Sequence, residues 1–525
     1  MNVSRLGRPV SLVIWILAVA LGCLVCRPAT AVEVPRIDIL LWFDTEDYLL
    51  PADDDACLRL ATLLSDRGIR ATFKVVGEKA RTLERRGRTD VITALQRHAI
   101  GYHANFHSVH PTPTEYLADC GWLDGIAEFI RREGGGATDV RRIFGVPTLA
   151  CYGQPGSSWG PQGVAALGPI GVAPAGVPCY VDEGSNVGWD QKPFWFAGAL
   201  NVYHMGKNHT RMELHDPAAV EPGMKEVSAV AERLAREDGG GLISIYYHPC
   251  EWVHQEFWDG VNFRRGRNPP REAWKAPPQL PPAETEAAFQ RFTAYVEHLR
   301  RIPGAQFITA GDLPLIYSDR LRSEGLGTNE LAQLSRQIVE TVRGGLTVQR
   351  LGNKVLSPAD QFEVLSTALA QFIVMGTVHA PIVPKGLFGP DGVPPSPQVA
   401  GNISWFTFRD TCRDVYDFIA SQHRIPARVF IGSDQIAPAD FLVMMAEGYL
   451  RCAELGKVPE DAEVRLRMGT ANSLERYVAA DTPELFGGWI IHREGFRAPR
   501  VVEMARLQAW TLKPAIRLTT IKLTE

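Results

Sequence analysis

The sequence predicts an α/β fold followed by a second, smaller domain. Short apolar runs alternate with segments of helical periodicity from residue 36 to residue 318, which is typical of a parallel sheet. Polar side chains follow several of the apolar runs, and the carboxyl ends of barrel strands converge on one face. This arrangement favours a parallel α/β barrel over a doubly wound sheet. The pattern of apolar and helical segments changes after residue 320. A chain of 525 residues is also longer than a typical single domain, which indicates a second one.

Apolar runs, helical spacing and glycines predict the elements in order. The expected strands are residues 37–43, 69–76, 99–103, 142–150, 242–248 and 306–309, and the expected helices are residues 53–64, 91–97, 116–132, 224–236 and 284–300. Each strand is a short apolar or β-branched run, and each helix carries apolar residues at helical spacing. Gly68, Gly77 and Gly239 mark the ends of a helix, a strand and a helix.

The region from residue 330 to residue 525 contains one motif twice. Leu351-Gly352 with Leu356-Ser357-Pro358-Ala359-Asp360 recurs eighty positions later as Ile431-Gly432 with Ile436-Ala437-Pro438-Ala439-Asp440. Each copy leads into an apolar helical run, and a serine followed by proline suits a helix start. The repetition predicts a duplicated α/β domain over residues 330–525. The alternative is that such tetrapeptides simply begin helices often.

The N-terminus has the pattern of a secretory signal peptide. Arg5 and Arg8 precede an apolar stretch over residues 11–26, and Ala29-Thr30-Ala31 supplies a small-x-small cleavage site. We expect residues 1–31 to be removed and the protein to be periplasmic or secreted. The alternative is an uncleaved N-terminal anchor, although the apolar stretch is short for a membrane span. No second stretch of the sequence is long and apolar enough to cross a bilayer.

The composition excludes several classes of partner and site. The formal net charge is −4, from 55 basic and 59 acidic residues, which argues against a nucleic-acid partner. Seven cysteines lie beyond residue 31, and they contain no C-x-x-C pair, so a cysteine zinc site is not expected. The oligomeric state has no signature in the sequence.

Two segments carry residues suited to a metal site. Asp44 and Glu46 follow the first apolar run, and His103, His107 and His110 follow another within eight positions. Two imidazoles and a carboxylate can hold a divalent metal and leave a coordination position open. The carboxylates have an alternative role as caps of the helix over residues 53–64. For His110 we favour a structural role before Pro111.

From about residue 36 to residue 318 the chain resembles the polysaccharide deacetylases of carbohydrate esterase family four. The matching segments are Phe43-Asp44-Thr45-Glu46, residues 68–77, residues 100–107, Ile245-Tyr246-Tyr247-His248-Pro249 and residues 306–313. The family uses a metal to remove N- or O-acetyl groups from chitin-like or peptidoglycan sugars. The resemblance therefore implies a distorted (β/α)7-type barrel over residues 32–320.

The resemblance also implies a role for each matched residue. Asp44 would be the general base, Glu46 the acidic metal ligand, and His103 and His107 the imidazole ligands. His248 would be the general acid. Without the resemblance, the better interpretation is a structural histidine at a strand end whose hydrogen bonds are made within the protein. One divalent metal is expected, with zinc the first choice and cobalt or another divalent ion also fitting this donor set.

Ala104 replaces the usual hydroxyl residue of the family's histidine motif, and two further family motifs are altered in this chain. The family has R-x-P, in which the arginine orients the catalytic base, whereas Gly153-Gln154-Pro155 retains only the proline. Gln154 is expected to hydrogen-bond the base without supplying charge, so the acid limb of the pH–rate profile should lie higher than in relatives with the arginine. The aspartate that supports the acid histidine is matched weakly by Asp190, with Asp182 and Glu183 as rivals.

The expected function is metal-dependent removal of acetyl groups from a polysaccharide or peptidoglycan-like glycan, a hydrolysis of carbon–nitrogen bonds other than peptide bonds. One alternative is a catalytically weak or inactive barrel that acts as a carbohydrate-binding module, which the lost arginine supports. Another is a metal-free glycoside hydrolase with paired carboxylates, which leaves the histidines unexplained. The duplicated region faintly resembles pseudomurein-binding repeats, which implies cell-wall or glycan binding; the alternative is a structural domain packed on the barrel.

Overall fold

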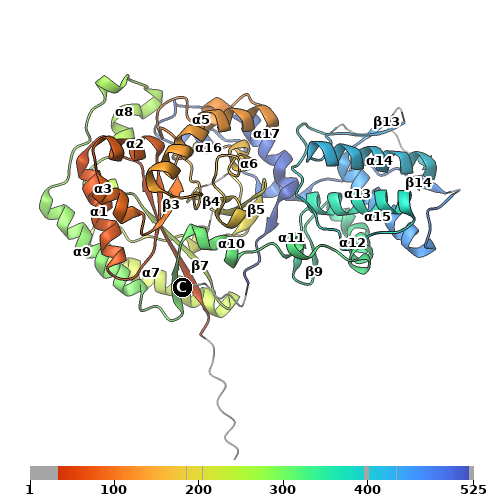
Figure 1. Ribbon diagram of the computed structural model, residues 1–525, viewed down its shortest axis with the longest axis horizontal. Helices are drawn as coiled ribbons and strands as arrows, with labels where there is room; N and C mark the ends of the chain where they lie inside the picture. The colour runs from red at the N-terminus through yellow and green to blue at the C-terminus, as the bar shows by residue number, and fades with distance from the viewer. Residues whose placement is uncertain are drawn as a thin grey trace, which may run out of the picture.

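The computed structural model describes residues 34–518 apart from residues 185, 204, 395–400, 433 and 461. The chain forms two lobes that lie side by side along the long axis (Figure 1). The large lobe on the left contains the red-to-green part of the chain and also its blue end. The small lobe on the right contains the teal and light-blue segments between them. The expected signal peptide lies outside the described residues.

A parallel sheet of five strands forms the centre of the large lobe. The strands are β1 (Ile37–Thr45), β2 (Thr72–Val75), β3 (Ala99–Tyr102), β7 (Gly241–Tyr247) and β8 (Ala305–Ile308). Their order is β3-β2-β1-β7, and β8 pairs with the first half of β1 while β2 pairs with its second half. All nine residues of β1 are buried. A strand buried on both faces reads as a continuous apolar run, which is why the sequence revealed it.

Further strands continue from β3, but they do not close a barrel. Tyr152 bridges β3 to β4 (Cys179–Val181), which pairs with β6 (Ala199–Val202), and β6 pairs with β5 (Phe194–Phe196). His209 makes a single bridge to β7. The described strands thus form no closed sheet, and the distorted barrel expected from the sequence is not confirmed. The sheet stays open because Tyr152 and His209 make only isolated bridges, where a closed barrel would need full strands.

The expected strand over residues 142–150 is wrong because a long helix covers its first part. α5 (Trp122–Phe144) runs through Gly134, Gly135 and Gly136 and ends at Gly145, whose φ is +62°. Glycine is required at position 136, since a Cβ there would lie 2.5 Å from the Tyr102 hydroxyl. The helix expected over residues 116–132 is instead split into α4 (Pro113–Leu117) and α5.

Helices surround the sheet of the large lobe. They include α1 (Pro51–Ser65), α2 (Gly77–Arg85), α3 (Thr89–Leu95), α6 (Pro161–Ala165), α7 (Val220–Asp238), α8 (Trp258–Phe263), α9 (Pro282–Leu299) and α10 (Leu313–Ile316). The next helix, α11 (Arg320–Glu324), lies in the small lobe, where Leu321 is buried in that lobe's core (Figure 1). The sequence predicted α1, α3, α7 and α9 but missed α2. Gly77, which was expected to mark the end of a strand, is the first residue of α2, and a Cβ on it would lie 2.8 Å from the Asn105 side chain.

The small lobe has its own apolar core and contains both copies of the repeated motif. Its elements are α12 (Thr328–Thr341), β9 (Gln349–Leu351), β10 (Lys354–Leu356), α13 (Pro358–Met375), β11 (Asn402–Ser404), α14 (Trp405–Gln422), β12 (Val429–Ile431), β13 (Asp434–Ile436), α15 (Pro438–Leu455) and β14 (Glu463–Arg465). Each copy forms a hairpin followed by an 18-residue helix that begins with proline. The two copies therefore have the same local structure.

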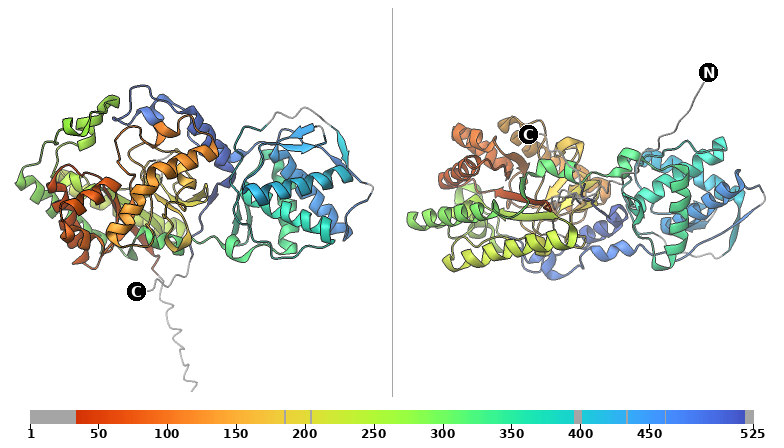
Figure 2. Two further views of the ribbon diagram at one scale, coloured as in Figure 1. Left: turned by 45° about the horizontal axis from the view of Figure 1, so that its top comes forward. Right: turned by 90° about the horizontal axis from the view of Figure 1, so that it is seen from below.

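The end of the chain returns to the large lobe. α16 (Pro483–Gly487), α17 (Pro499–Gln508) and β15 (Lys513–Pro514) lie there, and β15 pairs with β5. The two views of Figure 2 show the same blue segment against the large lobe. Leu474, Phe486, Val501 and Leu512 are buried in the core of the large lobe. A domain over residues 330–525 is therefore wrong in its last part, because these residues bury their apolar side chains in the first core.

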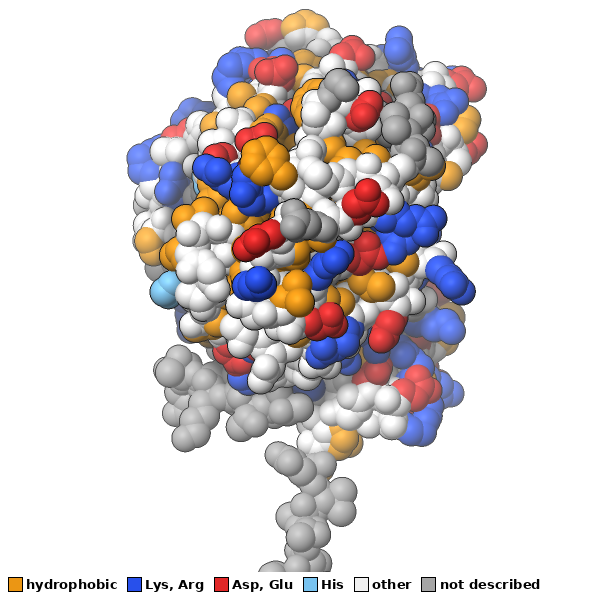
Figure 3. Space-filling view, turned by 90° about the vertical axis from the view of Figure 1, so that its right-hand side faces the viewer, with side chains coloured by type: hydrophobic (Ala, Val, Ile, Leu, Met, Phe, Trp, Pro, Cys, Tyr) orange, Lys and Arg blue, Asp and Glu red, His pale blue; other side chains and the backbone are white. Residues whose placement is uncertain are grey.

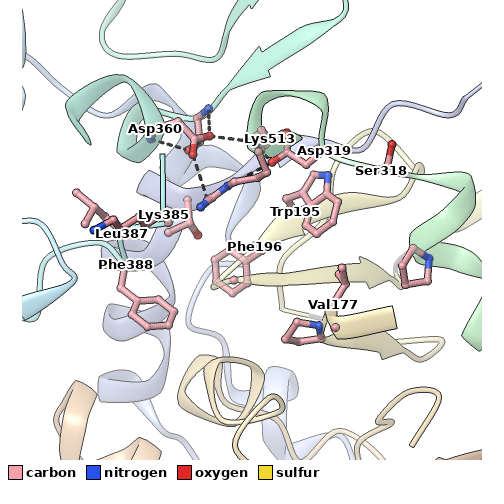
Figure 4. A pocket seen from close by; sticks show the side chains of 18 of the residues that line it. Val177, Trp195, Phe196, Ser318, Asp319, Asp360, Lys385, Leu387, Phe388 and Lys513 are labelled. Atoms are coloured by element: carbon pink, nitrogen blue, oxygen red, sulfur yellow. Dashed lines mark hydrogen bonds and ion pairs between the residues drawn. The ribbon is translucent and has the colours of Figure 1, made fainter. Parts of the chain in front are cut away.

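A cavity of about 420 Å³ lies where the two lobes meet. Figure 4 shows Lys513 between Asp319 and Asp360, with Trp195 and Phe388 nearby. The ammonium group of Lys513 is 2.6 Å from Asp319 and 2.9 Å from Asp360, so the returning segment, the connection between lobes and the small lobe are joined by ion pairs. None of the predicted catalytic or metal-binding residues lines this cavity.

The surface and the helices agree with the composition. On the face seen in Figure 3, blue and red side chains are interspersed and the apolar ones are scattered among them. This face therefore lacks the single-sign patch typical of nucleic-acid binding.

Within the described part of the chain, no helix combines the length and apolar character needed to cross a membrane. The seven described cysteines are all unpaired.

Candidate metal centre

The predicted site residues lie at the carboxyl ends of neighbouring parallel strands. Asp44 is near the end of β1, and Glu46 follows one residue beyond the strand. His103 directly follows β3, and His248 directly follows β7. Because these strands are parallel and belong to one sheet, their ends bring the four side chains to the same edge.

Glu46, His103 and His107 form a compact group of potential metal ligands. One atom from each residue lies within 4.8 Å of the others. Glu46 Oε2 is 3.5 Å from His103 Nε2 and 3.0 Å from His107 Nε2. All three side chains are buried. The segment after β3 and the end of β1 thus converge on one point, as the sequence led us to expect.

Each imidazole is held through its other ring nitrogen. His103 Nδ1 is 3.0 Å from the Gly153 carbonyl oxygen, and His107 Nδ1 is 2.7 Å from Ser108 Oγ. The Ser108 hydroxyl donates in turn to Asp259 at 3.2 Å. A proton on each Nδ1 satisfies these acceptors and leaves each Nε2 free as a ligand, which is the usual support for metal-binding histidines.

The donor set fits a divalent metal. His107 Nε2 is buried and makes no hydrogen bond within the described structure, although Glu46 Oε2 is close. Burial disfavours the ionised form of Glu46, but His107 and His103 outweigh this effect and hold the pKa of that carboxyl well below its usual range. An ionised carboxylate and two Nε2 atoms are ligands that zinc takes.

A loop, and not a helix, brings His103 and His107 together. Ala104 and His107 have φ angles of +62° and +56°, which break any helix over this segment. The loop is docked on the first turn of α2, where Gly77 and Glu78 donate their backbone N–H groups to the carbonyl oxygens of Ala104 and Asn105. The spacing alone did not distinguish this loop from a helix.

His110 has a partner outside the metal group. Its Nδ1 lies 2.7 Å from Glu115 in α4, and Glu115 also accepts the backbone N–H of Thr112. This ion pair and cap tie the segment after the metal ligands to the start of α4. The contacts agree with a structural role for His110.

Asp44 has a buried cationic neighbour that the sequence analysis missed. Lys74 of β2 places its ammonium 2.8 Å from Asp44 Oδ1 and 3.3 Å from Asp182 Oδ2. Burial opposes the charge of Lys74, but Asp44 and Asp182 outweigh it and raise the pKa of Lys74. The expected absence of a cation beside Asp44 is therefore wrong. A lysine inside the apolar run of residues 69–76 was the available signal.

Gly153 leaves room for this lysine. A Cβ on Gly153 would lie 2.0 Å from Lys74 Nζ. The position at which the resembled family has its arginine is thus next to an ammonium group that comes from another strand. Lys74 thus carries the same charge as the arginine of the resembled family, but it comes from a different part of the sequence.

Gln154 does not contact Asp44. Its side-chain amide donates to the Gly156 carbonyl oxygen, and its side-chain oxygen accepts the Tyr180 hydroxyl proton. Its backbone N–H donates to Asp182, the second partner of Lys74. The assignment of Gln154 as the group that orients the base is therefore corrected, because its side chain is already engaged elsewhere.

His248 is positioned by Glu251. His248 Nδ1 lies 2.7 Å from Glu251 Oε1, and His248 Nε2 lies 3.7 Å from Asp44 Oδ2. Arg211 donates to the same Glu251 carboxylate. Burial alone would lower the pKa of His248, but the Glu251 hydrogen bond and nearby carboxylates raise it to about 9. A protonated imidazole beside Asp44 is suited to donate a proton.

Asp190 is therefore not the support of His248. Its side chain is exposed and borders a separate cavity together with Trp189 and Tyr477. Asp182 binds Lys74, and Glu183 approaches His209 at 3.9 Å. The residue that does support His248 follows three positions after it in the 3-10 turn Pro249–Trp252, a short-range signal that the sequence contained.

Neither a protein-family model nor a curated protein matches this chain. Among solved structures, a polysaccharide deacetylase from Mycobacterium smegmatis is 12% identical, with a TM-score of 0.34, over 55% of this chain and 91% of that chain. A family 4 carbohydrate esterase from Streptomyces lividans in complex with acetate is 14% identical, with a TM-score of 0.25, over 49% and 87%. A peptidoglycan deacetylase from Bdellovibrio bacteriovorus is 14% identical, with a TM-score of 0.25, over 53% and 54%. Likenesses this distant do not establish an activity.

Proposed function

We propose that this protein is a metal-dependent hydrolase that removes acetyl groups from a polysaccharide or peptidoglycan-like glycan. The observation that carries the proposal is the buried ligand group Glu46, His103 and His107 beside a carboxylate, Asp44, and an imidazole, His248. A metal-free glycosidase would need two carboxylates and would leave both ligand histidines without a role.

Each residue at the site has a distinct part in the reaction. A divalent metal held by Glu46, His103 and His107, with zinc the first choice, would supply a Lewis acid that polarises the acetyl carbonyl group. Asp44 takes a proton from the attacking water. His248 gives a proton to the leaving nitrogen or oxygen of the sugar. Water thus adds to the acetyl carbon, the bond to the sugar breaks, and acetate and a free amine or hydroxyl result.

Two ion pairs prepare the base and the acid for these roles. Lys74 holds Asp44 by a charged contact of 2.8 Å, which fixes the position of the proposed base. Glu251 holds His248 by a contact of 2.7 Å, which favours its protonated, proton-donating form. The missing arginine was the main support for an inactive, glycan-binding protein, and Lys74 removes that support.

Two further parts of the proposal concern the rest of the chain. We propose that the protein is exported, since residues 1–31 have a signal-peptide pattern and acetylated cell-wall glycans lie outside the cytoplasm. We also propose that the small lobe binds glycan or cell wall. The faint resemblance of its repeats to pseudomurein-binding repeats supports this second part.

Metal analysis and acetate release from a panel of acetylated glycans test the proposal. We expect about one zinc or other divalent ion per chain in the wild type and loss of that ion in His103→Ala. Asp44→Asn should keep the metal but release acetate at least about 100-fold more slowly. Near-native acetate release by Asp44→Asn, or full metal occupancy in His103→Ala, would contradict it.

A further inference from the structure

A segment from the far end of the chain covers the candidate metal centre. This covering segment, residues 486–492, is attached at several points to loops around the site. The carbonyl oxygen of Phe486 accepts from Ser157 Oγ at 3.3 Å. The carbonyl oxygens of Ile490 and Ile491 accept the backbone N–H groups of Arg265 and Gly266 at 2.7 and 2.6 Å.

Buried side chains hold the covering segment in place. Ile491 is fully buried in a small apolar cluster with Tyr48, Trp258 and Phe263. His492 is also buried, with Nδ1 2.6 Å from the Phe486 carbonyl oxygen and Nε2 3.0 Å from Thr112 Oγ1. The covering segment is therefore firmly packed and forms part of the wall of the site.

Trp489 projects from the covering segment toward a metal ligand. Its ring lies 6.1 Å from the ring of His107 at an interplanar angle of 88°. On another side the indole packs on Gly156, where an added Cβ would lie 2.2 Å from the ring. Trp489 remains partly exposed, and its indole N–H has no hydrogen-bond partner in the described structure. The ring is thus packed against Gly156 on one side, and the residue as a whole remains partly exposed.

Phe257 flanks the centre at the acid histidine. Its ring lies 4.9 Å from the ring of His248 at an interplanar angle of 90°, and 37% of the residue is exposed. Phe257 immediately precedes α8, whereas Trp489 comes from the end of the chain. One aromatic ring thus stands beside a metal ligand and another beside the proposed acid.

We propose that Trp489 is a glycan-binding residue that stacks on a pyranose ring of the substrate next to the acetylated sugar, with Phe257 contacting the chain at the acid side. This inference deepens the proposed function and rests on it for the reaction. Partly exposed aromatic rings with a free polar edge are the groups that anchor ligands in concave sites. Trp489 also gives the returning chain end a role at a site built by strands more than 240 residues earlier.

The test compares Trp489→Ala and Trp489→Phe in the full chain. With a pentamer of β-1,4-linked N-acetylglucosamine as substrate, Trp489→Ala should raise KM about tenfold and change kcat less than about twofold. Trp489→Phe should recover most of the loss, because an aromatic face remains. Leu123→Ala is the control, since Leu123 is 57% exposed on α5 of the large lobe and should leave KM unchanged.

A binding measurement separates this inference from the proposed reaction. Calorimetry with the same pentamer is performed on zinc-loaded Asp44→Asn, with and without Trp489→Ala. A tenfold weaker affinity in the double variant supports the inference even if the wild type releases no acetate, which would contradict only the proposed function. Equal affinity in both variants overturns the inference. Loss of zinc in Trp489→Ala also overturns it, because Trp489 would then act only as a wall for His107.

Discussion

At the residue scale, the ammonium group of Lys74 lies between two carboxylates, Asp44 and Asp182. Burial raises the pKa of Asp182 to about 7 even with Lys74 beside it. Two buried carboxylates close together cannot both ionise easily without a cation. Lys74 therefore offsets part of the cost of burying these two carboxylates near each other. From the sequence, this lysine was expected only as part of the strand over residues 69–76.

Lys74→Met tests this role. The side chain keeps its approximate length and loses its charge, so a proton binds the carboxylate pair more readily. We expect kcat to fall by about 100-fold and the acid limb of the pH–rate profile to move up by about one pH unit or more. The measurement is acetate release from pH 4 to pH 10 at constant zinc occupancy. An unchanged acid limb would contradict the role.

Glu251→Gln tests the support of the proposed acid. His248 acts in its protonated form, and its pKa is raised to about 9, so activity should be present below that pH and lost as the pH rises through it. Without the Glu251 charge, the basic limb should move to lower pH by about one unit or more. Asp190→Asn is the control, because Asp190 is exposed and borders a separate cavity. A basic limb that moves in Asp190→Asn instead would reverse the assignment.

At the scale of elements, the site depends on how β2 and the loop after Tyr152 pack against each other. β2 carries Lys74, and the loop provides Gly153, whose backbone passes so close that no side chain fits. The same loop accepts the His103 Nδ1 proton through the Gly153 carbonyl oxygen. The close approach of Gly153 to β2 thus leaves room for Lys74 beside Asp44, and the Gly153 carbonyl oxygen orients His103.

Gly153→Ala should displace Lys74, because the added Cβ would lie 2.0 Å from its Nζ. We expect kcat to fall roughly 10- to 100-fold, since small displacements of catalytic groups have effects of this size. Gly153→Arg should be more harmful still, contrary to the idea that arginine restores a missing cation. Gly135→Ala in α5 is the control, because its Cβ meets nothing within 4 Å. Native turnover in Gly153→Ala would contradict the packing argument.

At the scale of the whole molecule, the large lobe is completed by both ends of the described chain. Arg517 forms an ion pair with Asp38 of β1 at 2.9 Å, and β15 adds a strand to β5. Met504 of α17 is buried in the large-lobe core. The small lobe is thus an insertion between two parts of one core, and the expectation of a separate barrel over residues 32–320 does not agree with this arrangement.

Truncation tests the shared core. A fragment of residues 32–325 should lack a cooperative thermal unfolding transition, because it exposes the apolar surface that α16 and α17 cover. In the full chain, Met504→Ala should lower the free energy of unfolding by about 2–5 kcal/mol, the usual cost of emptying a buried methionine site. Denaturant unfolding measures the second effect. A fragment that unfolds cooperatively at the temperature of the full chain would show that the returning segment is dispensable.

The sequence by itself predicted the strands that carry the site and the residues suited to bind a metal. Apolar runs, periodicity and motif spacing are local properties, so β1, β3 and β7 and the grouping of Glu46, His103 and His107 were accessible from it. The tertiary structure decided that Lys74 pairs with Asp44 and that Trp489 borders the centre. Lys74 and Asp182 are 108 residues apart, and Thr112 and His492, which hold the covering segment, are 380 apart. Contacts at such separations depend on which distant segments fill the space beside each strand end, and no local pattern encodes that packing.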